Sequence, residues 1–295
     1  MNLNEFEKYW QEQVSKGVSM PVMPREKWDS VKQYVEYLRH LSAYMLFARE
    51  FIANKRVLEI GCGTGYGANY LSELASRVVA VDTSKECISY FQDKYGKDNL
   101  FFLLADALNL PFKDDSFDIV VSFQVIEHIK PKEVLNYLRE IKRVLKTGGI
   151  FLVSTPNKRL RLLPFQKSWN PEHKKEYKDK ELKKLLSKVF SEVKVYGLCG
   201  SKEVLSIEKN RVKQNPFEVY VMAPLYKMLK HILPAPILLQ AKKLAKSILG
   251  SKSHYDEPIA QENFLNKFSL NDFKVDPGCP KDCIDLYGIC TKVEK

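Results

Sequence analysis

Cysteine is scarce in this sequence. Six cysteines among 295 residues are too few for a disulfide framework. Cys279 and Cys283 have a C-x3-C spacing without a partner pair, which is poor spacing for zinc, so we expect reduced thiols and no metal site. The sequence also lacks internal repeats and low-complexity tracts. What is left is typical of a globular chain, with 45% hydrophobic and 28% charged residues.

Long uninterrupted apolar runs are absent as well. The most apolar stretch, residues 217–249, is broken by Pro224, Pro234 and Pro236 and by a lysine every few residues, which a bilayer-spanning helix does not tolerate. The first ten residues are polar and acidic, unlike a secretory signal. We therefore expect a cytoplasmic protein.

The net charge of +11 is concentrated in one part of the chain. Residues 130–200 carry 18 Lys and Arg against 7 Asp and Glu, and residues 201–250 carry 9 against 3. Such a surplus suits nucleic acid, an anionic membrane surface or simple solubility. We find no RNA-binding module, and the Lys and Glu interleaved over 172–184 are typical of a solvated helix face, so nucleic acid is not the expected partner.

The pattern of apolar residues predicts an α/β fold. Residues 25–53 have the 3–4 spacing of a helix. Short apolar runs then alternate with helical stretches near 67–75, 84–95, 131–146 and 179–188. The predicted strands are Arg56–Ile60, Val78–Val81, Leu100–Leu104, Phe117–Phe123, Ile150–Ser154, Glu192–Leu198 and Cys283–Val293. This alternation predicts a doubly wound, mostly parallel sheet of seven strands, with the last two strands forming an antiparallel edge.

The predicted strands divide the chain into three parts. Residues 1–54 form a helical extension, and residues 55–200 with 282–295 form the sheet domain. Residues 201–281 are an insertion between the last two strands, which we expect to leave from the carboxyl edge of the sheet. Because ligands of open α/β sheets bind at that edge, we expect the insertion to act as a lid.

A glycine-rich turn provides the strongest local signal. Residues 57–67 read VLEIGCGTGYG, a buried strand followed by a turn and a helix. Glycine permits a sharp turn and close approach of a ligand to the backbone. Asp82 ends the next strand, where a carboxylate can accept hydrogen bonds from ribose hydroxyls. The segment therefore favours a nucleotide-like ligand.

A dinucleotide site is the alternative, because Gly63, Gly65 and Ala68 fit G-x-G-x-x-A. Against it, glycines recur at 61, 63 and 65, and Glu59 lies inside the strand before them. A carboxylate there suits a ligand with an amino group and a positive charge better than it suits a pyrophosphate.

The segment resembles the first motif of class I S-adenosylmethionine-dependent methyltransferases, with Rossmann-like fold. Downstream motifs agree with this resemblance, namely Leu104-Ala105-Asp106-Ala107, Leu110-Pro111-Phe112, Ser116-Phe117-Asp118, Ile126-Glu127-His128 and Arg143-Val144-Leu145-Lys146-Thr147-Gly148-Gly149. The resemblance implies S-adenosylmethionine as cofactor. By this resemblance, the methionine part of the cofactor would contact Glu59, Gly61, Gly63 and Gly65, the ribose Asp82, and the adenine Asp106 and Ala107. Gln124 would lie at the near side of the cofactor, and Cys62, Tyr66 and Thr83 are further implied contacts.

Two histidines are candidates for catalysis. Transfer of a methyl group to a hydroxyl needs a proton acceptor, and histidine suits that role near neutral pH. His128 lies just past the fourth strand, and His173 lies in the loop after the fifth. Each is either a base or an ordinary structural or solvated residue.

Other features resemble the type 11 methyltransferases associated with glycan biosynthesis. These features are His40-x-x-x-Tyr44, Tyr66-Gly67, Glu127-His128, Ser154-Thr155-Pro156-Asn157 and Asn170-Pro171-x-His173-x-x-Glu176. The resemblance implies O-methylation of a sugar, glycan or lipid-linked small molecule, with a histidine removing the proton. A quinone-pathway methyltransferase, an RNA methyltransferase and a non-catalytic cofactor-binding protein remain alternatives.

The insertion contains two amphipathic segments, 225–233 and 236–249, each with lysines opposite an apolar face. They predict either a lid packed on the catalytic core or a peripheral contact with an anionic bilayer through residues 217–250, at the inner face of the membrane.

Overall fold

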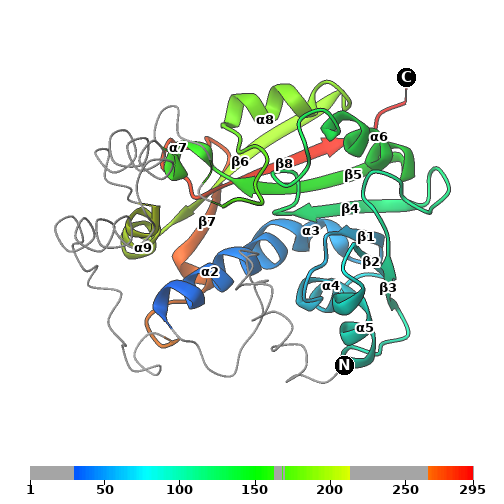
Figure 1. Ribbon diagram of the computed structural model, residues 1–295, viewed down its shortest axis with the longest axis horizontal. Coiled ribbons are helices and arrows are strands. Elements are labelled where there is room, and N and C mark those ends of the chain that lie inside the picture. The colour runs from blue at the N-terminus through cyan, green and yellow to red at the C-terminus, as the bar shows by residue number, and fades with distance from the viewer. Residues whose placement is uncertain (1–29, 163–167, 169, 213–264, 295) are drawn as a thin grey trace, which may run out of the picture.

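One eight-stranded sheet organises the molecule, with helices on both of its faces (Figure 1). The computed structural model describes residues 30–162, 168, 170–212 and 265–294. The strand order is β3-β2-β1-β4-β5-β8-β6-β7. The strands are β1 Arg56–Ile60, β2 Arg77–Asp82, β3 Leu100–Leu104, β4 Phe117–Phe123, β5 Leu145–Pro156, β6 Glu192–Gly200, β7 Phe273–Asp276 and β8 Asp285–Thr291.

The helices form two layers. One apolar cluster lies between the sheet and α2, α4, α5 and α9, and a second lies between the sheet and α6 and α8. The helical elements are α2 Val31–Ser42, π-helix η1 Ala43–Ala48, α3 Arg49–Ile52, α4 Tyr66–Ser72, α5 Lys85–Lys94, α6 Val134–Val144, α7 Lys158–Arg161, α8 Asp179–Leu186, α9 Lys202–Val212 and 3-10 helix η4 Leu270–Asp272. No helix in the described ranges combines the length and the apolar character that crossing a bilayer requires.

The parallel part of the sheet agrees with the prediction. Strands β1, β2, β3, β4 and β5 pair in parallel, and four of the five residues of β1 are buried. Strand β8 runs antiparallel between β5 and β6, so β6 points in the same direction as β5. The carboxyl ends of six strands therefore meet at one edge, and the strand order reverses between β1 and β4.

The sheet has eight strands rather than the seven predicted. The additional strand, β7, lies inside the range 201–281 that we assigned to the insertion, and it pairs antiparallel with β6. It is only four residues long, Phe-Lys-Val-Asp, which is too short for a clear alternating pattern.

The insertion leaves the carboxyl end of β6 through α9, as expected. The segments 225–233 and 236–249 lie outside the described residues, as do residues 1–29 of the predicted N-terminal extension.

A buried arginine links the N-terminal helix to the sheet. Arg39 on α2 is only 2% exposed, and its guanidinium lies 3.4 Å from Glu208 on α9 and 3.4 Å from Asp285 at the start of β8. Both carboxylates are buried as well. Since the two anions need a cation in this apolar surrounding, Arg39 couples three elements that are distant in sequence.

Replacing Arg39 by leucine should therefore destabilise the fold strongly. We expect Arg39→Leu to lower the free energy of unfolding in urea by about 3–5 kcal/mol, because it leaves two buried carboxylates without their cation. The matched control is Lys132→Leu, which removes an exposed 3.9 Å pair with Glu133 and should cost less than about 1 kcal/mol. Equal losses in the two variants would contradict this role of Arg39.

Candidate active site

The turn after β1 brings the backbone to the carboxyl edge of the sheet. Gly61, Gly63 and Gly65 have φ angles of 75°, 50° and 68°, a region that favours glycine. A Cβ at Gly61 would overlap Val125, whereas a Cβ at Gly63 would meet no atom within 4 Å. The turn is therefore packed on one side and open on the side of Gly63, where a ligand can approach the backbone.

Glu59 lies beneath this turn as a buried carboxyl group. Glu59 is only 1% exposed, and Tyr44 donates a hydrogen bond of 2.6 Å to its Oε1. The second oxygen, Oε2, is buried and has no hydrogen-bond partner among the described residues. Burial, reinforced by the nearby Asp82 and opposed by the Tyr44 hydrogen bond, raises the pKa of Glu59 to about 8. The site thus presents an acceptor that a cationic group would satisfy.

Tyr44 is a site residue that we did not assign from the sequence. It lies on η1, and π-helical turns occur often at functional sites. Its ring packs edge-on against Phe123, with centroids 5.0 Å apart, and fills the space that a Cβ at Gly67 would need. The spacing His40-x-x-x-Tyr44 put the tyrosine on the right helix, but only the packing of η1 on the glycine turn shows its contact with Glu59.

Asp82 is held against the glycine turn by two backbone amides. Gly63 N donates to Oδ2 at 2.9 Å, and Ser84 N donates to Oδ1 at 3.0 Å. Thr83 beside it is exposed. The carboxylate at the end of β2 is therefore fixed next to the open face of Gly63.

The other predicted contacts lie at the same edge. Asp106, after β3, is exposed and accepts a hydrogen bond of 2.9 Å from Leu108 N, while Ala107 is buried. Gln124, after β4, has a φ of 58° and donates from its side chain to Ser154 at 3.2 Å. Cys62 is buried in the glycine turn.

A pocket opens between η1, the glycine turn and the carboxyl ends of β4 and β5. Its walls include Tyr44, Tyr66, Phe123, Gln124 and Ser154. Two of the predicted contacts, Tyr66 and Gln124, therefore line this pocket together with Tyr44, which bonds Glu59.

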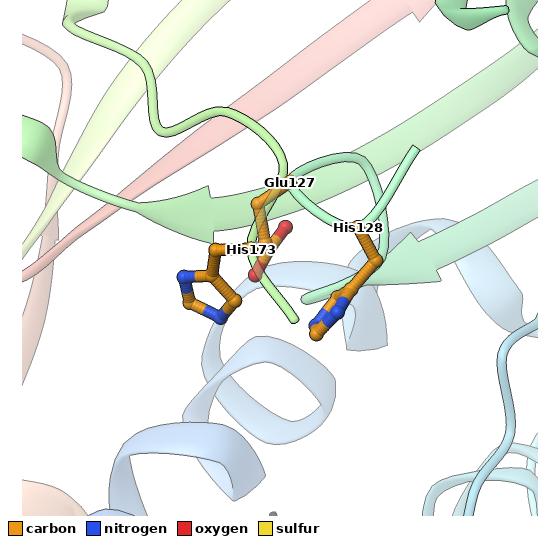
Figure 2. A group of neighbouring side chains, drawn as sticks. All are labelled: Glu127, His128 and His173. Atoms are coloured by element: carbon orange, nitrogen blue, oxygen red, sulfur yellow. The ribbon is translucent and has the colours of Figure 1, made fainter. Parts of the chain in front are cut away.

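The two candidate histidines lie together, as Figure 2 shows. Their ring centroids are 4.8 Å apart and the rings are nearly perpendicular. Burial and the neighbouring His173 lower the pKa of His128 to about 4, so its imidazole is neutral at pH 7.

His173 is oriented by a buried carboxylate. Its Nδ1 lies 2.8 Å from Glu176 Oε1, which also accepts a hydrogen bond of 2.8 Å from Ser168. Burial tends to raise the pKa of Glu176, but the bonds from His173 and Ser168 and the charge of Arg161 lower it overall. With an ionised Glu176, Nδ1 carries the proton and Nε2 keeps its lone pair.

Glu127 lies beside both rings and is fully buried (Figure 2). Thr155 donates a hydrogen bond of 3.0 Å to Oε2, and Oε1 has no partner among the described residues. Burial raises the pKa of Glu127 to about 8. The main-chain oxygen of Glu127 accepts hydrogen bonds from the amides of Lys174 and Lys175, which tie the His173 loop to the end of β4.

Comparison with known proteins identifies the sheet domain. A family model described as a methyltransferase domain matches residues 58–153. A probable S-adenosylmethionine-dependent methyltransferase of Mycolicibacterium smegmatis is 37% identical over 158 residues, which cover 53% of this chain and 59% of that relative. Residues 58–153 are therefore similar to the methyltransferase domain of S-adenosylmethionine-dependent methyltransferases. The chain spans less than two thirds of the length of this relative.

Two further similarities concern the same domain. A fatty-acid O-methyltransferase of Mycolicibacterium smegmatis is 33% identical over 132 residues, covering 44% of this chain and 46% of the relative. A solved S-adenosylmethionine-dependent methyltransferase of Thermotoga maritima superposes with a TM-score of 0.54 at 18% identity, covering 97% of each chain. This second likeness shows the fold, and it extends beyond the matched domain.

Binding of S-adenosylmethionine should be coupled to the ionisation of Glu59. In the free protein near pH 7 the carboxyl is largely protonated, and a cationic ligand favours the carboxylate, so binding should release about one proton from this group. The coupling should tighten binding as the pH rises from 6 to 7.5. Isothermal titration calorimetry in buffers of different ionisation enthalpy measures this release.

The matched control for this titration is Glu59→Gln, which keeps a side chain able to bond Tyr44 but cannot ionise. The difference in proton release between the two proteins cancels any titration of the cofactor itself. Equal proton release by the native protein and Glu59→Gln would show that Glu59 does not carry the coupling.

Proposed function

We propose that this protein is an S-adenosylmethionine-dependent methyltransferase that methylates a hydroxyl of a sugar, glycan or lipid-linked small molecule. The observation that carries the proposal is the buried, unpartnered Oε2 of Glu59 beside the open face of Gly63, with two histidines at the same sheet edge. These are the features that an amino-bearing cationic cofactor and a deprotonated acceptor require.

The residues present fit the cofactor. Glu59, with Gly61, Cys62, Gly63, Gly65 and Tyr66 in the turn, would hold its methionine part. Asp82 and Thr83 would hold the ribose, and Asp106 and Ala107 would hold the adenine. Gln124 would contact the side of the cofactor that faces the pocket. The unpartnered Glu59 Oε2 suits the ammonium group, because a buried carboxylate needs a charged donor. The cofactor supplies a methyl group already activated on a sulfonium.

The chain's own contribution is to orient the acceptor and accept its proton. Glu176 holds the Nδ1–H of His173, so Nε2 can take the proton of an acceptor hydroxyl. The cofactor would supply the methyl group to the acceptor oxygen and would leave as the neutral thioether, while His173 would hold the acceptor's proton. The imidazole of His128 is neutral at pH 7 and places a second polar ring beside His173.

Two observations support the proposed class of acceptor, namely the positive charge of part of the chain and the similarity to a named relative. Residues 130–250 carry the basic surplus of the chain, and one relative of the domain is named a fatty-acid O-methyltransferase. Both favour an anionic or lipid-bearing acceptor. We extend the proposal to a cytoplasmic protein in peripheral contact with the inner membrane face through residues 217–250, on the sequence pattern alone.

Transfer of labelled methyl groups tests this function. The full chain should move radiolabel from S-adenosylmethionine into the glycan or lipid-linked fraction of an extract of its native host. His173→Gln should reduce the rate about 10²-fold or more, because it removes the imidazole that Glu176 orients to accept the proton. Glu133→Gln, a half-buried carboxylate at the start of α6 that pairs with Lys130 at 3.6 Å, is the control and should transfer at the native rate.

Other outcomes contradict the proposal in distinct ways. Label in RNA or quinones would overturn the acceptor class. Cofactor binding without transfer to any fraction would indicate a non-catalytic binding protein, and an unchanged rate in His173→Gln would remove His173 from the chemistry.

A further inference from the structure

We propose that Glu127, His128 and His173 form a binding site for a divalent transition-metal ion of the Zn²⁺ type. The proposal goes beyond the methyltransferase function, and the binding of the ion does not depend on it. The sequence led us to expect no metal site, because we sought one in the cysteine spacing.

The three side chains converge from two loops. Each offers one ligand atom, and these atoms all lie within 4.8 Å of one another. Figure 2 shows the Glu127 carboxylate beside both imidazole rings. The amides of Lys174 and Lys175 bond the main-chain oxygen of Glu127 at 2.7 and 3.1 Å, so the two loops are held together by backbone contacts.

The buried carboxylate provides a second observation that points to a ligand. Glu127 is 0% exposed, and its Oε1 has no partner among the described residues. An unpartnered buried oxygen is costly, and it is costlier when the group is ionised. A cation between Glu127 and the rings would supply the missing interaction and favour the carboxylate.

Both histidines are arranged as metal ligands usually are. Glu176 holds Nδ1 of His173 at 2.8 Å, which leaves Nε2 free to coordinate. The main-chain oxygen of Glu172 accepts a hydrogen bond from His128, which fixes that ring in the same way. Metal-bound histidines characteristically donate their other ring nitrogen to a carboxylate or a carbonyl, which sets the tautomer.

The donor set selects the class of ion. Two imidazole nitrogens and one carboxylate oxygen suit Zn²⁺ and related first-row ions, whereas Mg²⁺ and Ca²⁺ prefer oxygen ligands alone. Ligand atoms on a tetrahedral ion with bonds of about 2.1 Å lie about 3.4 Å apart. The present separations lie within 4.8 Å, so any that exceed this spacing require the side chains to turn inward on binding.

The three protein ligands leave a coordination position open. In the proposed methyl transfer, an acceptor hydroxyl at that position would have a lowered pKa. A proton and the ion would compete for the same Nε2 of His173. When the ion is bound, it would therefore replace the imidazole as the group that promotes deprotonation of the acceptor hydroxyl. This consequence for catalysis rests on the proposed function, whereas the site itself does not.

Titration of the full-length, chelator-treated protein with Co²⁺ tests the site. Binding of one equivalent should give the visible absorption bands of a four- or five-coordinate ion, and Zn²⁺ should displace it. Glu127→Gln and His173→Gln should each weaken binding about 100-fold or more. Glu176→Gln, which acts on the proposed ion only by orienting its ligand His173, should weaken binding 10- to 100-fold.

Two matched variants control for general effects of these substitutions. His40→Gln on α2 and Glu133→Gln at the start of α6 should leave Co²⁺ affinity unchanged. Circular dichroism and S-adenosylmethionine binding show whether each variant is folded, so lost metal binding cannot be mistaken for unfolding.

Absence of the visible bands, or equal Co²⁺ affinity in the native protein and the Glu127 and His173 variants, would overturn the site. Thiolate charge-transfer absorption would also overturn it, since that would assign the ion to cysteines such as Cys279 and Cys283, whose sulfurs lie 3.8 Å apart. Methyl transfer is measured separately: metal binding without transfer would contradict the proposed function alone, and transfer without metal binding would contradict the site alone.

Discussion

The hydrogen bond between Tyr44 and Glu59 joins the two parts of the site. It connects the π-helical turn η1 to a carboxyl buried at the end of the first strand, at a distance of 2.6 Å. The glycine turn must have no side chain at Gly67 for the tyrosine to lie there. Within the part of the chain that the structure describes, Oε2 of Glu59 has no partner, so this packing leaves a buried acceptor that a cationic ligand would satisfy. The N-terminal helices therefore contact the proposed binding site directly through Tyr44.

Sheet topology explains why the remaining functional groups meet. The parallel strands and β6 all end at one edge, and the order reverses between β1 and β4, so loops distant in sequence converge there. Arg39 anchors α2 to β8 and α9 in the same region. The buried ion pairs therefore hold α2, which continues directly into η1 and Tyr44, against the sheet.

Much of the fold could be predicted because it follows from short-range patterns in the sequence. The buried strand before Gly61, the acidic residue at the end of β2 and the alternation of strands and helices are all short-range features. The four-residue β7 lacked such a pattern, since its place in the sheet comes from pairing with β6. The contacts of Tyr44 with Glu59 and of Thr155 with Glu127 are also long-range. The sequence predicts the helix, strand or loop in which each of these residues lies. The contacts between their side chains depend on how those elements pack in three dimensions.

A crystal structure of the full chain with S-adenosylhomocysteine tests the central claim most directly. The account predicts the amino group of the ligand at about 3 Å from Oε2 of Glu59, with the ribose beside Asp82 and the backbone of Gly63 against the ligand. A ligand bound at another edge of the sheet, or bound at this edge with Oε2 of Glu59 still unpartnered, would contradict it.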